Sequence, residues 1–290
     1  MKSASMIGLA VASFTLAGMG CVGCTVDTPK SDNKVIKNIE RGRFPHQLWG
    51  ATLAKYNKAG FVDYEALSKD RADLDAYLNA ISKTSPRNKP ELFVDKDDQL
   101  AYWINAYNAL IFQNVLRRLP GIKRVDESLL KFFMLDSFNL GGETFSLKGL
   151  EDEVVRAVYR DPRIHFALNC ASFSCPRLPE EAFTGEKLDA QLDRETRKFV
   201  AEPRNVTIDE AGGKLILSKL FDPSWFQSDF TDFPTAQAVV EAGSAAEKVV
   251  AFINLYRAAD AQIPAREGGW SLESRTYDWT LNSPAAAPLR

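Results

Sequence analysis

The chain of 290 residues has room for one or two domains, and its apolar content of 45% is ordinary for a globular protein. Its net charge of −2 provides no positive surface field, so nucleic acid is excluded as an expected partner. No internal repeat is visible along the chain.

Residues 1–24 have the pattern of a secretory signal. Lys2 supplies a weak positive charge, and the apolar, small residues 6–20 follow it. This stretch is too short and too rich in Gly and Ala for a stable membrane-spanning helix. We therefore expect an exported protein whose folded part follows a flexible polar tether over 25–40.

Two cysteines, Cys21 and Cys24, close this signal segment, and each follows a glycine. A Cys at such a junction resembles a bacterial lipoprotein signal, in which the Cys becomes the lipidated first residue. Neither Cys has the usual Leu three residues before it, and ordinary cleavage to a soluble product is the alternative. We expect lipidation of one of the two, so that the protein is held at the membrane, facing the periplasm.

Helical and extended patterns alternate irregularly over 41–282. Apolar residues at helical spacing predict helices, and short runs joined across Gly-Gly pairs predict hairpins. In chain order we expect helices over 46–56, 71–81 and 97–119, a hairpin over 138–147, a helix over 150–159, a strand over 164–169, a helix over 186–200, a hairpin over 206–217, a helix over 245–258, an extended segment over 275–282 and a tail over 283–290. Short hairpins mixed with many helices favour an α+β fold, with a single domain over 41–282 and a small, mostly antiparallel sheet.

The stretch 97–119 predicts the buried central helix of this domain. Apolar residues recur on one side, and the other side is hardly polar, which is typical of a helix enclosed by protein. Asp97 or Asp98 can cap its first turn. Asn105 and Asn108 project from one face of the helix. They either tie the helix to neighbouring loops or line a binding site, because a buried Asn needs hydrogen-bond partners.

The stretch 161–178 is the most unusual in the sequence, because it holds His165 together with the two cysteines of the predicted domain, Cys170 and Cys175. The first interpretation is nucleophilic catalysis by Cys170, since a thiol needs a base or a cation nearby to become a thiolate. His165 is the available base, and Arg177 is a neighbouring cation.

The second interpretation is a Cys170–Cys175 disulfide, which export permits and which the intervening turn can close. The third is a metal site with two Cys and one His as zinc-type ligands, but the spacing is irregular and a fourth ligand is not evident. The sequence also lacks a phosphate-binding loop and a His-Glu-x-x-His motif. We therefore expect no metal and no cofactor.

Three motifs in this order resemble the domain-of-unknown-function family 547. They are Trp103-Ile104-Asn105-Ala106-Tyr107-Asn108-Ala109, His165-Phe166-Ala167-Leu168-Asn169-Cys170 with Ser174-Cys175-Pro176, and Tyr277-Asp278-Trp279-Thr280-Leu281-Asn282. Members of that family occur in bacteria and plants, and the family has no settled activity. The resemblance implies a single domain, here in an exported bacterial member, and a role for these positions, but it supplies no reaction.

A buried helix, then a His-bearing strand, then an Asp-bearing strand is also the order in transglutaminase-like and papain-like cysteine enzymes. In those folds the nucleophilic Cys opens the core helix, whereas no Cys lies within 97–119. By this analogy either the nucleophile has moved to Cys170 or the protein has lost catalysis. Likeness of fold alone does not decide function.

Two functions follow for this envelope protein, and both leave its substrate or protein partner open. In the first, the domain is a cysteine hydrolase or acyl transferase in which Cys170 attacks and His165 is the base. Asp278 then orients the imidazole, and the backbone amides of 171–174 stabilise an oxyanion. In the second, the Cys170–Cys175 disulfide staples a non-catalytic binding or scaffold domain. The remaining candidate binding residues are Asn105, Asn108, Asn169 and Arg177.

Overall fold

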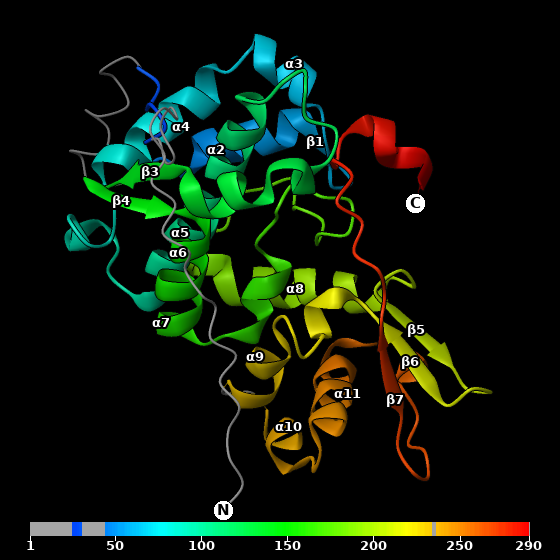
Figure 1. Cartoon of the computed structure of the whole chain (residues 1–290). Helices are drawn as coiled ribbons and strands as arrows, with labels where there is room; N and C mark the ends of the chain where they lie inside the picture. The colour runs from blue at the N-terminus through cyan, green and yellow to red at the C-terminus, as the bar shows by residue number, and fades with distance from the viewer. Residues whose placement is uncertain (1–24, 31–43, 234–235, 290) are drawn as a thin grey trace, which may run out of the picture.

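The computed structural model describes residues 25–30, 44–233 and 236–289, and these have the α+β fold that the sequence predicts (Figure 1). The described strands form one three-stranded and two two-stranded sheets among the helices. The predicted signal segment, with Cys21 and Cys24, lies outside the described residues. Among the residues that are described, no helix is long and apolar enough to cross a lipid bilayer.

The first part of the fold packs helices around one buried helix, α5 (Lys96–Leu116). The elements before it are α2 (His46–Tyr56), β1 (Asn57–Lys58), β2 (Phe61–Val62), α3 (Tyr64–Lys69), α4 (Ala72–Lys83) and η1 (Pro90–Leu92). Every residue of α5 from Leu100 to Leu116 is buried, which confirms the predicted central helix. Its cap is Asp95, whose carboxylate accepts a hydrogen bond from the backbone N–H of Asp98 at 2.8 Å. The helix therefore begins slightly earlier than the sequence predicts.

The middle of the chain adds a hairpin and several short helical turns beside α5. After α5 come η2 (Val125–Ser128), η3 (Lys131–Leu135), β3 (Ser137–Leu140), β4 (Glu143–Ser146), α6 (Leu147–Gly149), η4 (Leu150–Arg156), α7 (Ala157–Tyr159) and η5 (Pro162–Phe166). The β3–β4 hairpin turns at Gly141 and Gly142, whose φ angles of +58° and +89° are the positive values for which glycine is suited.

The predicted strand over 164–169 is wrong, because this stretch begins inside the 3-10 helix η5. Asp161 caps that helix through the backbone N–H two residues later, at 2.9 Å. Beyond η5 the side chain of Asn108 donates to the carbonyl of Ala167 and accepts from the N–H of Asn169, both at 2.9 Å. Local capping and a side-chain amide thus satisfy backbone groups that a strand would pair with a neighbour.

The last part of the chain combines helices with a mixed sheet. Its elements are η6 (Gly185–Lys187), α8 (Leu188–Ala201), β5 (Val206–Asp209), β6 (Lys214–Leu217), η7 (Lys219–Phe221), α9 (Gln227–Asp232), α10 (Gln237–Glu241), α11 (Ala245–Tyr256), η8 (Ala259–Ala261), β7 (Ser271–Ser274) and η9 (Pro284–Leu289). β5 and β6 form the predicted antiparallel hairpin, and β7 pairs with β6 in parallel. The chain after β7 runs back along the first part of the fold (Figure 1), where Thr280 bridges to Arg124 and Leu281 to Ser172.

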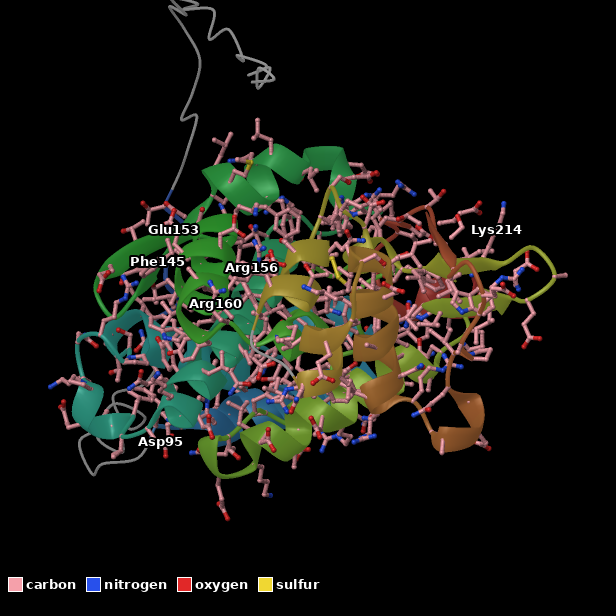
Figure 2. All side chains as sticks on the ribbon, turned by 90° about the horizontal axis from the view of Figure 1, so that it is seen from below. Asp95, Phe145, Glu153, Arg156, Arg160 and Lys214 are labelled. Carbon is pink, nitrogen blue, oxygen red and sulfur yellow. A yellow bond between two sulfur atoms is a disulfide. The ribbon has the colours of Figure 1, made fainter. Side chains whose placement is uncertain are left out.

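Buried apolar side chains gather in two clusters. The α5 core comprises α5 with the buried residues of α2 to α6 and η4, and the C-terminal core comprises buried residues of β5, β6, η7, α9 and α11. Helix α8 serves both, since Leu192 belongs to the α5 core and Phe199 to the C-terminal core. Arg156 and Arg160 lie beside the helices of the C-terminal core, where the two clusters meet (Figure 2).

Candidate functional site

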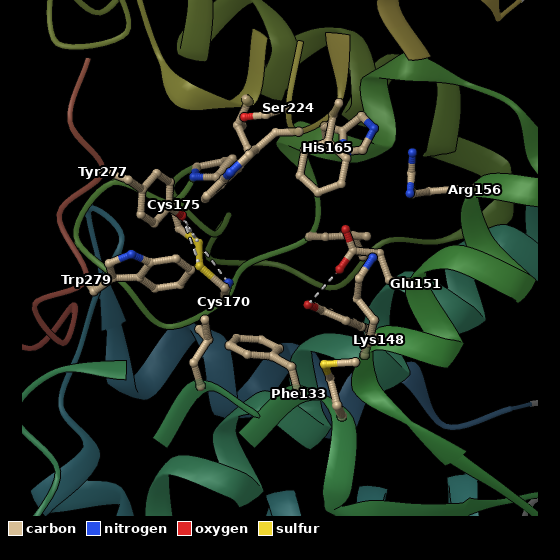
Figure 3. Close-up of a pocket in the computed structure, with 18 of the residues that line it drawn as sticks. Phe133, Lys148, Glu151, Arg156, His165, Cys170, Cys175, Ser224, Tyr277 and Trp279 are labelled. Carbon is tan, nitrogen blue, oxygen red and sulfur yellow. Dashed lines mark hydrogen bonds between the residues drawn. A yellow bond between two sulfur atoms is a disulfide. The ribbon is translucent and has the colours of Figure 1, made fainter. Parts of the chain in front are cut away.

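A cavity of about 470 Å³ lies between the two cores (Figure 3). Its walls come from α5, η3, η4, the loop after η5, the turn before α9 and the segment after β7. The lining residues are Tyr107, Leu129, Leu130, Phe133, Met134, Lys148, Glu151, Arg156, His165, Leu168, Cys170, Cys175, Pro176, Leu220, Ser224, Trp225, Phe226, Tyr277 and Trp279. A mostly apolar space with a few polar groups is typical of a small-molecule site.

A disulfide joins Cys170 to Cys175 in one wall of this cavity (Figure 3). The turn between them brings their Cα atoms to 6.1 Å, and Ala171 takes a φ of +61° within it. The side chain of Asn169 stabilises that turn by accepting a hydrogen bond from the Ala171 N–H at 2.8 Å. The disulfide interpretation of the sequence is therefore confirmed, and Cys170 carries no free thiol in this structure.

Two hydroxyl groups and one backbone amide surround the bonded sulfurs. The hydroxyl of Tyr277 lies 3.1 Å from each sulfur, and that of Ser172 lies 3.0 Å from the Cys170 sulfur. The N–H of Cys170 donates to the Cys175 sulfur at 2.8 Å. Burial raises the pKa of Tyr277, against the opposing effect of its hydrogen bond from Ser172, so Tyr277 stays a neutral donor. Cys170 is partly exposed to the cavity, whereas Cys175 is only 4% exposed.

His165 binds Asp229 and not the predicted Asp278. Its Nε2 lies 2.7 Å from an Asp229 carboxylate oxygen, and Arg156 donates to both oxygens of that carboxylate at 2.7 and 2.9 Å. Burial raises the pKa of Asp229, but the hydrogen bonds from His165 and Arg156 outweigh it and lower the pKa to about 2. The imidazole also packs against the ring of Phe226, with ring centres 4.3 Å apart.

Asp278 and the amides proposed for an oxyanion hole are used elsewhere. The Asp278 carboxylate accepts from the N–H of Thr280 at 2.9 Å and lies 3.8 Å from an Arg124 nitrogen, outside the cavity lining. The N–H groups of 171, 173 and 174 donate to the Asn169 side chain, the carbonyl of Thr280 and the carbonyl of Asp278. These donors are therefore not aimed at a reacting group.

The predicted binding residues on α5 tie the helix to other segments. The Asn105 amide donates to the carbonyl of Phe183 at 2.7 Å and accepts from its N–H at 3.0 Å. Asn108 makes the matching pair of bonds to the chain beyond η5, as described above. Both amides are buried and hydrogen-bonded to backbone groups. Of the two interpretations of the sequence, the tie to neighbouring segments therefore describes them, and the lining of a binding site does not.

Asn169 and Arg177 also lie outside the cavity lining. Asn169 donates to the carbonyl of Pro176 at 2.6 Å, which holds the far end of the disulfide loop. Arg177 lies 2.6 Å from a carboxylate oxygen of Glu202, in a separate surface depression. The structure thus brings Cys170, Cys175 and His165 to one cavity and places the other described candidates outside its lining.

Glu151 is the main cavity residue that the sequence did not single out. It lies on η4 and accepts a hydrogen bond from the Tyr107 hydroxyl at 3.2 Å. Burial raises the pKa of Glu151, and the nearby charges of His165 and Lys148 oppose that rise. The position follows Leu147 by four residues, and helical spacing from that buried leucine was the signal that Glu151 faces inward.

The fold and the cavity define an α+β protein with an aromatic pocket and a disulfide in its wall. Residues 92–200 match the family described as "Protein of unknown function, DUF547", which supports the resemblance seen in the motifs. This match covers α5, Glu151 and the disulfide loop, but not Asp229 or Tyr277. Searches of curated proteins and of solved structures found no significant match to the chain. Among the described residues, no group of three or more His, Cys, Asp or Glu side chains is arranged to hold a metal ion.

Proposed function

We propose that the protein is a non-catalytic binding domain whose cavity holds a small organic cation with an apolar body. One observation carries this proposal: the Glu151 carboxylate faces the cavity opposite the rings of Tyr277 and Trp279 (Figure 3). A partly buried carboxylate without a salt-bridge partner is costly, so a bound cation stabilises it.

The neighbouring lysine and arginine at the cavity wall are paired with carboxylates other than that of Glu151. Lys148 is paired with Asp152, and Arg156 is held by Asp229. Glu151 takes part in no salt bridge within the described part of the chain. The cation of a ligand would therefore complete an ion pair that the protein itself leaves open.

The aromatic wall favours the same class of ligand. The ring of Tyr277 lies 4.8 Å from that of Trp225 and 4.6 Å from that of Trp279, measured between centroids. Aromatic faces attract cations, and packed rings present that attraction without losing side-chain freedom on binding. An apolar body on the ligand would fill the remaining space beside Phe133 and Leu130.

The alternative function, a cysteine hydrolase or acyl transferase, has less support. Its nucleophile requires a free thiol, and the Cys170 sulfur is bonded to Cys175. Its base requires an imidazole nitrogen directed at the thiol, whereas the side-chain hydroxyls of Ser172 and Tyr277, and not His165, lie at the Cys170 sulfur. The disulfide instead fixes one wall of a binding cavity.

Binding can be measured by the fluorescence of Trp225 and Trp279 during titration with benzyltrimethylammonium, using neopentylbenzene as the neutral analogue of the same shape. We expect the cation to bind more tightly, and Glu151→Gln to weaken its affinity by about tenfold or more while leaving the neutral analogue unaffected. The matched control is Glu153→Gln, at an exposed position two residues away. Equal affinity for the two probes, or an unchanged affinity in Glu151→Gln, contradicts the proposal.

We also propose that this binding takes place in the cell envelope, with the chain anchored through a lipid on Cys21 or Cys24. The signal pattern of residues 1–24 and the disulfide, which persists in oxidising compartments, support this location. Cell fractionation tests it, since the natural protein should be found with membranes and a variant with both cysteines replaced by Ser should not. Recovery of the natural protein entirely in a soluble fraction rules out the lipid anchor.

A further inference from the structure

We propose that the Cys170–Cys175 bond is a thiol-exchange site, at which a low-molecular-weight thiol entering the cavity reduces the disulfide reversibly. This activity goes beyond ligand binding and does not depend on the cation proposed above. It rests on the position of the disulfide in the cavity wall and on the hydrogen-bond donors placed around its sulfurs.

The two sulfurs differ in their access to an incoming thiol. Both cysteines line the cavity, but Cys170 is partly exposed, whereas Cys175 is only 4% exposed. A thiolate must reach the sulfur that it attacks, and access is one of the factors that set exchange rates. The incoming thiolate therefore attacks Cys170, and Cys175 becomes the leaving group.

Two hydrogen-bond donors lie next to the Cys175 sulfur, which is the leaving group. The N–H of Cys170 donates to the Cys175 sulfur at 2.8 Å, and the hydroxyl of Tyr277 donates to it at 3.1 Å. Hydrogen bonds to a thiolate favour its charged form, and a thiol of lower pKa leaves faster. The hydroxyl of Ser172 supports this arrangement by donating to the Tyr277 oxygen at 3.0 Å. The same donors would stabilise the reduced form of the pair.

The exchange balances with two thiols. The first thiolate forms a bond to the Cys170 sulfur, the bond between the protein sulfurs breaks, and its electron pair stays on Cys175. A second thiolate then attacks the sulfur of the first thiol, which releases a low-molecular-weight disulfide and leaves Cys170 as a thiolate. Two electrons pass from the two thiols to the protein, and the reverse reaction with a low-molecular-weight disulfide restores the bond.

The loop keeps its other supports when the disulfide opens. The N–H of Phe173 donates to the carbonyl of Thr280 at 2.7 Å. The N–H of Asn282 donates to the carbonyl of Ala171 at 2.9 Å. Asn169 holds both ends of the turn, as described above. A bond that closes so short a loop adds less stability, by constraining the unfolded chain, than one that closes a long loop. The disulfide can therefore open and close without unfolding the domain.

The rate of reduction under native conditions is the first test. Oxidised full-length protein is mixed with reduced glutathione, samples are blocked with N-ethylmaleimide, and the modified cysteines are located by peptide mass spectrometry. We expect reduction without denaturant, with unchanged near-ultraviolet circular dichroism. Tyr277→Phe keeps the ring but removes the donor, and it should slow reduction by about three- to tenfold. The matched control is Tyr159→Phe, which removes a partly buried hydroxyl away from the sulfurs and should leave the rate unchanged.

The second test asks which sulfur reacts. Cys175→Ser and Cys170→Ser each leave one domain cysteine, and both are treated with oxidised glutathione in a chain that also carries Cys21→Ser and Cys24→Ser. We expect Cys170 to form the glutathione adduct at least about tenfold faster than Cys175, because it is the accessible thiol. Reduction that requires urea, equal rates for the two cysteines, or a Tyr277→Phe rate equal to that of the natural protein overturns the proposal. If the cysteine variants do not fold, the Tyr277→Phe comparison still decides it.

Discussion

Two sets of buried polar groups, the amides on α5 and the carboxylate beside the C-terminal core, are satisfied in different ways. In the α5 core the neutral amides of Asn105 and Asn108 bind the backbone of distant segments. Beside the C-terminal core the buried group is charged, since Asp229 binds Arg156 and His165 next to phenylalanine rings. A matched neutral amide depends only on geometry, whereas a buried charge also depends on pH and on every partner remaining in place.

This difference locates the site. The α5 core supplies a fixed wall, because its amides are already satisfied by backbone, and it carries Tyr107 into the cavity. The C-terminal part supplies the aromatic wall of Trp225 and Tyr277, and the charged groups lie where the two meet. A ligand at this boundary contacts both cores at once. Substitutions in either core therefore test whether the two cores differ as described.

The largest expected effect comes from removing one ring from each core. Phe112→Ala and Phe252→Ala each empty a fully buried site, and each should lower the free energy of unfolding by about 3–5 kcal/mol. Helix α8 contributes to both cores, so we expect a single urea transition for the natural chain and for both variants. Two separate transitions, one moved by each variant, would show that the cores are independent units instead of the single domain that the sequence predicts.

The next effect concerns the buried charge. Asp229→Asn removes one of the two carboxylate partners of Arg156, leaving Asp152, and should cost about 2–3 kcal/mol at pH 7. Because the folded-state pKa of Asp229 is lowered from 3.8 to about 2, its contribution is present above the ordinary pKa and is lost as the pH falls through the folded-state value. Urea unfolding between about pH 5 and pH 2 should therefore show a steeper loss for the natural protein than for Asp229→Asn. If the free energies of unfolding of the natural protein and of Asp229→Asn fall in parallel with pH, Asp229 does not contribute in this way.

A smaller loss is expected for a neutral tie in the α5 core. Asn105→Leu removes the partner of both backbone groups of Phe183 and should cost about 1–3 kcal/mol, with no dependence on pH between about 5 and 8. Gln47→Leu makes a similar change at an exposed position of α2 and should stay within about 0.5 kcal/mol of the natural protein. A urea midpoint equal to that of the natural protein would mean that the Phe183 backbone finds other partners.

The two cores also differ in how far the sequence predicts them. Helix α5 was predictable because it is apolar on nearly all sides, and the hairpin at Gly141 and Gly142 because tight turns need positive φ. The secondary structure of the run 164–169 was not predictable, since a short apolar run fits a strand or a buried helical turn equally well. Its cap and its tie to Asn108 decided the outcome.

The site was predictable only in part, for a related reason. Cys170, Cys175 and His165 stood out because these residue types are rare in the chain, and the short spacing of the cysteines allowed the disulfide. The acid that holds His165 is Asp229, which lies 64 residues away, and nothing local distinguishes it from Asp278. Glu151 stands in a run of acidic residues that normally marks a solvated helix face, so its partial burial depends on the packing of η4 against α5.

The smallest expected effect is a gain in stability, from Glu151→Gln. This variant is also the one expected to weaken cation binding, so it separates binding from stability. Burial raises the folded-state pKa of Glu151 above its ordinary value. The folded protein is therefore most stable, as far as this group is concerned, below the ordinary pKa, and it loses that stability as the pH rises through the folded-state pKa. Glu151→Gln removes this charge, so at pH 7 it should stabilise the protein by less than about 1 kcal/mol, and the gain should vanish near pH 4. Urea unfolding of the natural protein and the variant at both pH values measures the difference, with Glu153→Gln as the exposed control. If Glu151→Gln is instead destabilised at pH 7, the carboxylate already has a partner inside the fold, and the open charge on which cation binding rests does not exist.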